Sequence, residues 1–436
     1  MNKPRLYAMA LTAMACALCA LPAAADSQAR IVRLSDVQGT VQINKNTGLG
    51  FERAFLNLPV TQGAQLRTRD NGRAEIEFED GSTLRITPNT TVEFSTLGAS
   101  DGKHFSAVNL VDGRAYVNWV GKSGDKIELN VSHEKIDLAQ PAHFRVAASS
   151  DKIAVASFKN ELQVAGPSGV VKVDKKKEVA FDPNENDQAA VAKNLQADPY
   201  DEWDHQSVSY HDEYAKNNNT PYGYGYSDLS YYGSFTNYPG YGSMWQPYFM
   251  GAGWNPFMDG AWSWYPGMGF MWASAYPWGW MPFYYGNWVY GSGFGWAWQP
   301  GGWNGWNGGF HYAGAPATFR PPIAPTGAVT AVSVGRAGTT TIGQSPVARL
   351  SGGSAGLGIA RGSLDNLHHL NSQVAKTGFV EVHPAPQFAA TSARAGGFGF
   401  GEVPISAANS GRAGAGAPPA AGHASGGGVA VAGGHH

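Results

Sequence analysis

Residues 74–86, Ala-Glu-Ile-Glu-Phe-Glu-Asp-Gly-Ser-Thr-Leu-Arg-Ile, carry the pattern that decides the fold. Apolar and charged residues alternate before Asp80-Gly81, as they do on a strand that buries one of its faces. Asp-Gly is a hairpin turn signal, and Thr83–Ile86 returns with the same alternation. The stretch predicts a β-hairpin whose apolar side chains face a core, while the carboxylates of Glu75 and Glu77 point outward.

The same kind of pattern continues on both sides of this hairpin. From about residue 30 to residue 182, short alternating runs are separated by turn signals. A turn about every eight to twelve residues is typical of a β-sandwich, a barrel or a solenoid. No segment in this region has the period of a helix, and roughly 150 residues suffice for one core. We therefore predict a single all-β domain over residues 30–182.

Five runs in this region carry a family resemblance. They are Val37–Val41, Gln62–Thr68, Asn71–Ser82, Leu84–Ile86 and Val111–Val117. Together they resemble the FecR-type domain. The resemblance implies an extracytoplasmic all-β domain, which in the protein that gave the family its name couples an outer-membrane receptor to an anti-sigma system. That protein has a transmembrane helix before the domain, whereas a different kind of segment stands there in this sequence.

Residues 1–25 have the layout of a secretory signal peptide. Two basic residues precede the apolar run Leu6–Leu21, which ends in a small-residue site at Ala25. The run is about sixteen residues, shorter than the roughly 20 that span a bilayer. We expect cleavage, export to the periplasm, cell surface or exterior, and no transmembrane helix afterwards. Cys16 and Cys19 leave with this segment, which excludes disulfides and cysteine-ligated metals in the mature chain.

Composition changes sharply in residues 221–312. The chain has 14 Trp, and 12 of them lie between Trp245 and Trp306, in a region that contains no Lys or Arg. An internal repeat has an offset of 26 residues, since residues 253–272 match residues 279–298. This module resembles the Gly-Trp-x-Pro-aromatic repeats of secreted bacterial proteins that also carry a FecR-like domain. That second resemblance implies architecture and location, but no activity.

Six rings of these repeats form the candidate binding surface. They are Trp262, Trp264, Trp288, Tyr290, Trp296 and Trp298. Trp and Tyr faces stack on sugar rings and on cations, so an exposed surface would bind an envelope polymer. Alternatively, the rings are the core of small β units that lack aliphatic residues, or the module is a self-associating material.

The two remaining regions are poor in apolar residues. Residues 183–220 are polar and acidic, and we expect an acidic linker with at most a short helix. Residues 313–436 consist mainly of Ala, Gly, Pro and Ser. Such a composition buries too little apolar surface to offset the entropy of ordering, so we expect a disordered low-complexity tail.

The sequence contains no candidate catalytic residues, cofactor site or metal site, and we predict that the protein is not an enzyme. The formal net charge is −2, and the rings lie where basic residues are absent, which argues against nucleic acid as a partner. The predicted function is non-catalytic binding or assembly at the cell envelope, with a polymer or a protein as partner and self-association possible. The alternative is a regulatory sensor that relays an envelope signal to a protein partner through the FecR-like domain.

Overall fold

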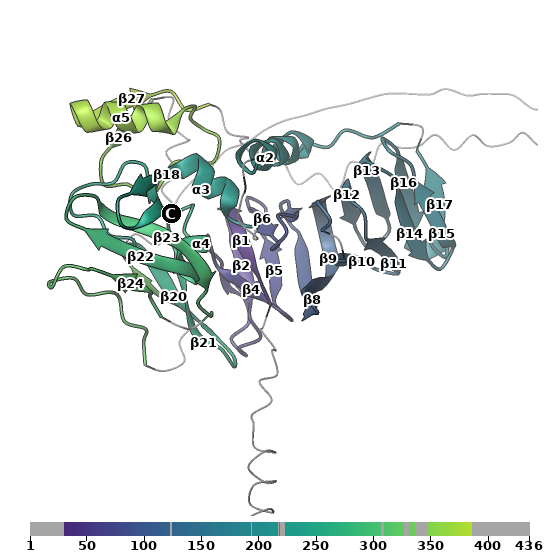
Figure 1. The fold of residues 1–436 in the computed structure, drawn as a ribbon. Helices are drawn as coiled ribbons and strands as arrows, with labels where there is room; N and C mark the ends of the chain where they lie inside the picture. The colour runs from purple at the N-terminus through teal and green to yellow at the C-terminus, as the bar shows by residue number, and fades with distance from the viewer. Residues whose placement is uncertain are drawn as a thin grey trace, which may run out of the picture. The chain divides into compact units, whose positions relative to one another are not determined.

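The structure, a computed structural model, describes residues 30–122, 124–192, 194–216, 218, 223–306, 309–326, 331–335 and 347–385. The predicted signal peptide lies outside these residues, and so does the predicted tail beyond residue 385. The described chain is rich in strands, which confirms the all-β class (Figure 1).

Seventeen strands of the described chain form the β domain, in two layers that share one core. Their bounds are β1 Ile31–Gln38, β2 Val41–Asn44, β3 Glu52–Arg53, β4 Pro59–Thr61, β5 Gln65–Thr68, β6 Arg73–Glu77, β7 Thr83–Ile86, β8 Thr91–Ser100, β9 Lys103–Trp119, β10 Lys126–Val131, β11 Glu134–Leu138, β12 Ala142–Ala148, β13 Ile153–Lys159, β14 Leu162–Gly166, β15 Gly169–Val173, β16 Glu178–Asp182 and β17 Gln188–Val191. One layer has the order β4-β1-β6-β7-β9-β12-β13-β16-β17. The other layer has the order β3-β2-β5-β8-β9-β10-β11-β14-β15.

Strand β9 belongs to both layers. Its first half pairs with β8 and β10, and its second half pairs with β7 and β12. The strand changes layer at Gly113, whose φ of 97° lies in a region that L-residues rarely adopt. A Cβ at this position would also collide with the backbone of Thr90. Only glycine therefore lets one strand run through both layers.

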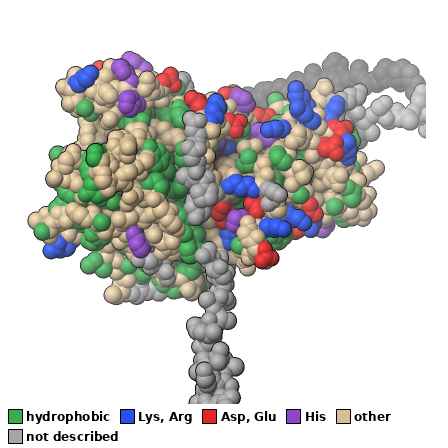
Figure 2. All heavy atoms as spheres, in the orientation of Figure 1, with side chains coloured by type: hydrophobic (Ala, Val, Ile, Leu, Met, Phe, Trp, Pro, Cys, Tyr) green, Lys and Arg blue, Asp and Glu red, His purple; other side chains and the backbone are tan. Residues whose placement is uncertain are grey.

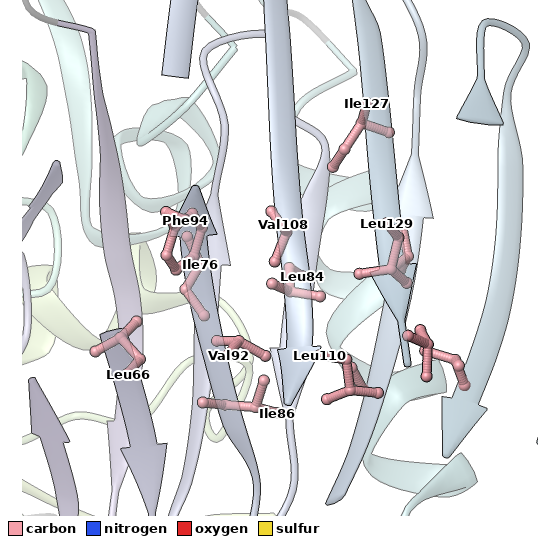
Figure 3. Close-up of a cluster of buried hydrophobic side chains, with 14 of the residues drawn as sticks. Leu66, Ile76, Leu84, Ile86, Val92, Phe94, Val108, Leu110, Ile127 and Leu129 are labelled. Atoms are coloured by element: carbon pink, nitrogen blue, oxygen red, sulfur yellow. The ribbon is translucent and has the colours of Figure 1, made fainter. Parts of the chain in front are cut away.

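The core between the layers is mainly aliphatic, and we call it the aliphatic core (Figure 3). The apolar residues of the deciding stretch, Ala74, Ile76 and Phe78, are buried in it, which confirms the predicted alternation. Glu75 and Glu77 point away from this core, but the expectation that they reach solvent is wrong, because both are also buried. The second face of their layer is covered by other parts of the chain.

Two helices contribute to that cover. They are α2 (Asp201–Tyr214) and α3 (Tyr226–Tyr232), and a 3₁₀ turn η1 (Pro183–Glu185) precedes β17. Trp203 and Tyr210 of α2 are buried, and Tyr226 and Leu229 of α3 join the aromatic core that follows. Most of the expected linker is therefore packed structure: β17 occupies its first part, and α2 is longer than the short helix we allowed for.

The aromatic module consists mainly of hairpins. Its elements are β18 Gly233–Tyr238, β19 Gly242–Pro247, β20 Gly260–Tyr265, β21 Gly269–Ser274, α4 Met281–Tyr284, β22 Tyr285–Gly291, β23 Gly295–Trp303, β24 Tyr312–Ala313 and β25 Ala331–Val334. They form one sheet in the order β18-β19-β23-β22-β24 and another in the order β21-β20-β25.

Each of the two predicted 26-residue units contains one hairpin, and the two hairpins have the same register. Trp262 faces Trp272 in the first, and Trp288 faces Trp298 in the second. The hairpin β18–β19 precedes them with an equivalent pairing, Phe235 opposite Trp245. The module therefore has three equivalent hairpins, one more than the sequence comparison found.

A glycine diagonal to a tryptophan of the paired strand recurs in these hairpins. A Cβ on Gly233 would fall inside the indole of Trp245, and a Cβ on Gly260 would fall inside the indole of Trp272. The ring occupies the space that a side chain at the glycine would need, in the manner of aromatic rescue of strand glycines. Glycine is thus part of how the module packs its rings.

Part of the expected tail has structure. Residues 347–385 form a two-stranded sheet, β26 (Ala348–Ser351) with β27 (Phe379–Val382), and a helix α5 (Leu367–Thr377). Leu350, Ile359 and Leu364 are buried in the aromatic core, which supplies apolar contacts that the segment lacks by itself. The prediction of disorder is therefore wrong for this segment. No helix in the described parts of the chain is long and apolar enough to cross a membrane.

Candidate functional site

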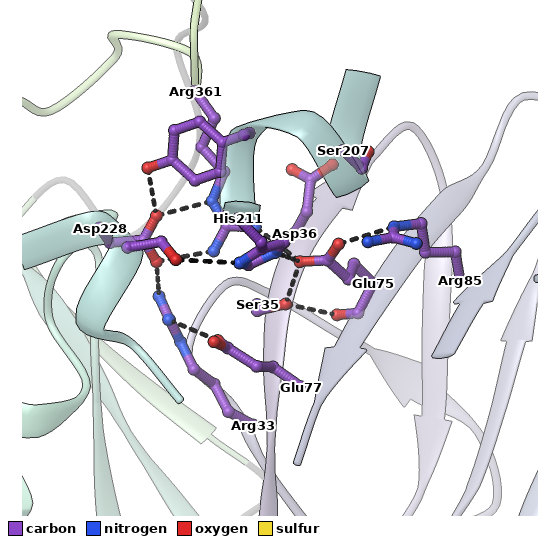
Figure 4. Close-up of polar contacts among 12 residues, drawn as sticks. Arg33, Ser35, Asp36, Glu75, Glu77, Arg85, Ser207, His211, Asp228 and Arg361 are labelled. Carbon is purple, nitrogen blue, oxygen red and sulfur yellow. Dashed lines mark hydrogen bonds and ion pairs between the residues drawn. The ribbon is translucent and has the colours of Figure 1, made fainter. Parts of the chain in front are cut away.

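Glu75 of β6 lies at the centre of a buried network of charged side chains (Figure 4). Its Oε2 accepts a hydrogen bond from Nε of Arg85 at 2.8 Å. Its Oε1 contacts Nε2 of His211 at 2.9 Å and accepts from Nη1 of Arg361 at 2.7 Å. The hydroxyl of Ser35 donates to the same oxygen at 2.7 Å. Strands β1, β6 and β7, helix α2 and the segment before α5 therefore meet at one carboxylate.

Asp228 of α3 is the second centre. Its Oδ2 pairs with Nη2 of Arg33 at 2.7 Å and with Nη2 of Arg361 at 2.6 Å. The hydroxyl of Tyr210 donates to Oδ1 at 2.8 Å. Arg33, which is fully buried on β1, also pairs with Glu77 at 3.0 Å. We call these side chains, together with those around Glu75, the junction network, because they join the β domain to the segments that follow it.

Electrostatics favours the ionised form of both central carboxylates. Burial opposes ionisation of Glu75, but the charges of His211 and Arg85 outweigh it and hold the pKa of Glu75 well below its usual range. Burial is likewise outweighed at Asp228, chiefly by Arg361, and the pKa of Asp228 is lowered. Removing one partner would leave a charge buried without compensation.

Helix α2 positions its share of the network by its periodicity. Its buried side chains are Trp203, Asp204, Tyr210 and His211, two adjacent pairs seven residues apart, which places them on one helical face. Asp204 Oδ1 accepts from Nη1 of Arg85 at 2.9 Å. These residues were not predicted from the sequence, although the spacing of the two pairs was a signal that could have revealed them.

Ser227, His211 and Glu75 contact one another in the same sequence as the serine, histidine and acid of a hydrolase triad. Nδ1 of His211 lies 3.1 Å from Oγ of Ser227, and its Nε2 lies 2.9 Å from Oε1 of Glu75. Ser227 is buried in the first turn of α3 and does not line the neighbouring cavity. Because this hydroxyl is buried, its contact with His211 holds α3 against α2.

A cavity of about 580 Å³ adjoins the junction network. Asp36, Tyr210, His211 and Arg361 are among the residues on its wall. Burial raises the pKa of Asp36, and the charge of Arg361 opposes this shift. The volume is within the range of small-molecule sites, and a molecule bound there would contact the junction network directly.

The six rings of the candidate binding surface divide into two groups. Trp262, Trp288, Trp296 and Trp298 are buried in the aromatic core, whereas Trp264 and Tyr290 are half-buried. The core alternative therefore describes the first four rings, and a stacking role stays a prediction for the other two. Charged side chains gather over the β domain and are sparse over the aromatic hairpins on the face in Figure 2. Within the described ranges, no group of three or more His, Cys, Asp or Glu is placed to hold a metal ion.

Two known protein families match separate stretches of the chain. Residues 64–163 match the FecR protein family, which confirms the FecR resemblance for that stretch. Residues 226–323 match a family of unknown function, DUF6600, and this match spans the three aromatic hairpins. The β domain of the structure extends beyond the FecR match on both sides.

Among solved structures, two crystal structures of a "putative anti-sigma factor" from Parabacteroides distasonis are similar to this chain. Each has 18% sequence identity and a TM-score of 0.28, covering 34% of this chain and 72% or 71% of the other. That score is too low to define a common fold. A search of curated proteins finds no match.

Proposed function

We propose that this protein is a non-catalytic regulator of the cell envelope, which relays a signal to a protein partner through its FecR-like domain. The observation that carries the proposal is the FecR match over residues 64–163. The same stretch supplies Glu75, Glu77 and Arg85 to the junction network. The regulatory role follows from the family resemblance, and the location follows from the predicted signal peptide.

The junction network offers a physical route for such a relay. A ligand in the adjoining cavity, or a partner that displaced α2, would disturb the contacts that His211 and Asp204 make. Those contacts end on Glu75 and Arg85, which lie on adjacent strands inside the FecR match. Because buried ion pairs are sensitive to the loss of one partner, a small movement of α2 would change the energy of both strands.

The regulatory proposal is tested in the bacterium that carries the gene. We expect deletion to change the transcript levels of a limited gene set, and the intact gene to restore them. A variant with Arg361→Met should restore them less well at equal protein abundance, whereas Lys126→Met, at an exposed position on β10, should restore them fully. Unchanged transcripts after deletion, under every envelope stress tried, would exclude the regulatory role.

Export is tested separately. We expect the mature chain to begin at Asp26 and to fractionate with the periplasm, the cell surface or the medium. Mass spectrometry of the purified N-terminus measures the first point, and cell fractionation with cytoplasmic and periplasmic marker proteins measures the second. An intact Met1 in a chain recovered with the cytoplasmic markers would contradict export.

Binding of an envelope polymer is a second candidate, because Trp264 and Tyr290 keep part of their rings exposed. Titration of the chain from residue 26 with peptidoglycan fragments should then shift Trp fluorescence, with a smaller shift for Trp264→Ala. An equal response in wild type and in a variant lacking both rings would rule out these rings as the binding surface.

A further inference from the structure

The two ends of the β domain differ in the contacts that the rest of the described chain makes with them. At the end formed by β3 and β4, the hydroxyl of Tyr265 donates to the carbonyl of Pro59, and Nζ of Lys45 bonds Oγ of Ser263 at 2.7 Å. The aromatic module therefore covers this end. At the other end, the last strands are β15 and β17 (Figure 1). Among the described residues, β17 pairs only with β16, so its outer edge has no strand partner.

The outer edge of β17 carries apolar residues from the core face. Val191 is opposite Val179, and Ala189 is opposite Phe181. Residues directly opposite each other in an antiparallel pair share a face, and Val179 and Phe181 are buried in the aliphatic core. Val191 thus lies on the core side of the layer, yet 67% of it is exposed. The apolar face continues past the last strand without cover.

Charges at the two ends of β17 are opposite in sign. The turn that precedes β16 has exposed lysines, Lys175 and Lys176, beside the Val191 end, since residue 192 bonds to residue 178. Glu185 is exposed in η1 beside the Gln188 end. In an antiparallel pair of two such edges, the lysine end of one would meet the glutamate end of the other.

We propose that β17 pairs edge to edge with β17 of a second copy of this chain. The pairing is antiparallel about a two-fold axis, and it extends one layer of the β domain across two molecules. It covers Ala189 and Val191, and it brings Lys176 of each copy to Glu185 of the other. This proposal goes beyond the regulatory function and does not depend on it.

The apolar pattern also sets the register of the pair. In a continuous sheet, opposite residues must lie on the same face, and a shift by one residue would place core-side residues opposite solvent-side residues. The register that pairs Ala189 with Val191 of the second copy therefore places Ala190 opposite Ala190. The two Ala190 Cα atoms should then be about 4.5–5.5 Å apart.

A charge swap tests the proposed pairing. Four residues make a short edge, so we expect a weak dimer, and sedimentation equilibrium from about 5 to about 300 µM covers that range. Lys176→Glu should weaken dimerisation about tenfold, because it places a glutamate beside Glu185 of the other copy. The two-fold axis repeats this repulsion at a second position. The double variant Lys176→Glu with Glu185→Lys should dimerise with an affinity within about threefold of the wild type. Lys126→Glu, an exposed control on β10, should leave it unchanged.

A single cysteine gives an independent readout. The chain from residue 26 has no cysteine, because Cys16 and Cys19 precede it. Ala190→Cys should form a disulfide-linked dimer under mild oxidation, since its Cα separation across the axis falls in the range that disulfides bridge. Leu49→Cys is the matched control at a similarly exposed position, and it should form no disulfide-linked dimer. Circular dichroism confirms that each variant is folded.

Several results would overturn the proposal. A monomer up to the highest concentration, with no disulfide at Ala190→Cys, would remove the second copy as the occupant of this edge. A dimer that is insensitive to Lys176→Glu would place the interface elsewhere. Because none of these assays reads transcription, failure here leaves the regulatory proposal standing, and failure of that proposal leaves the dimer standing.

Discussion

At the scale of single residues, Glu75 shows how one side chain acquires a role from its surroundings. On its strand it occupies an outward position, yet it binds two arginines, a histidine and a serine in a buried place. Its charge balances the buried charges of Arg85 and Arg361, which it shares with Asp204 and Asp228. We expect the junction network to be more sensitive to charge removal than any ion pair at the surface.

Glu75→Gln tests this expectation. Removing one partner of a buried ion pair typically lowers the free energy of unfolding by about 3–5 kcal/mol, because the remaining charge is left buried. The matched control is Glu128→Gln, which removes a partner of the exposed Lys135 and should change the free energy of unfolding by no more than about 1 kcal/mol. Urea unfolding measures both. Equal effects of the two substitutions would contradict a central role for Glu75.

Glu134, at the start of β11, differs from Glu75 because, within the described chain, its carboxylate is not surrounded by arginines. Both of its carboxylate oxygens are buried and lack a hydrogen-bond partner among the described residues. Burial, together with the charge of Asp187, raises the pKa of Glu134 from 4.5 to about 7, and the attraction of His133 opposes the shift. In the folded protein, this carboxyl group is therefore protonated over a range of pH in which the unfolded chain is ionised.

The raised pKa of Glu134 predicts a pH dependence with a definite sign. Between pH 4.5 and about 7 the folded state binds the extra proton, so the stability that this group contributes falls as pH rises through that window. Glu134→Gln should flatten this part of the curve and raise the melting temperature more at pH 8 than at pH 5. Thermal unfolding at several pH values measures it, and parallel curves for variant and wild type would show that Glu134 is not the titrating group.

At the scale of elements, the hairpins of the aromatic module depend on glycine and tryptophan together. Gly260→Ala would place a methyl group inside the indole of Trp272, and we expect it to lower the free energy of unfolding by about 1–3 kcal/mol, as overpacking does. Gly253 lies in the same module with open space at its Cβ position, so Gly253→Ala should have little effect. Chemical unfolding followed by Trp fluorescence compares them. A neutral Gly260→Ala would mean that the ring is not seated over the glycine.

The hairpins also separate core rings from surface rings. Trp288 is buried among other rings, so Trp288→Ala should lower the free energy of unfolding by about 3–5 kcal/mol through lost burial and the cavity left behind. Trp264 is half-buried, and Trp264→Ala should have less than half of that effect. The same unfolding assay serves for both. Similar losses for the two substitutions would show that Trp264 also belongs to the core.

At the scale of the whole described chain, the junction network joins the β domain to the aromatic module. Arg33 contributes to both, since it pairs with Glu77 on β6 and with Asp228 on α3 and donates to the carbonyl of Pro277. Ile31, on the same strand, packs in the aromatic core. Breaking such shared contacts should uncouple the two parts more than it weakens either part alone.

We therefore expect a single calorimetric transition for the wild type and two transitions for Arg33→Met. The variant removes the guanidinium group while keeping much of the side-chain volume, so its main effect is on the charged contacts. Differential scanning calorimetry at one pH and protein concentration measures the number of transitions. Two transitions in the wild type would show that the parts unfold independently despite the network.

Sequence alone was enough for the β domain because alternation is a local property. The pattern of residues 74–86 specifies which side chains share a face, and the hairpin turn follows from Asp80-Gly81. The two aromatic units were equally accessible, because identical spacings of Gly and Trp produce hairpins of identical register. These features depend on neighbours within a few residues, which a linear sequence records directly.

Only the tertiary structure decided what covers the second face of the strands. Glu75 and Glu77 alternate with apolar residues as they would on a solvated face, and of their partners only Arg85 lies in the same hairpin. The groups that complete the network, His211, Asp228 and Arg361, come from segments that the composition marked as linker, aromatic module and tail. Alternation defines a face but not its cover, because long-range packing depends on which distant segments complement that face in charge and shape.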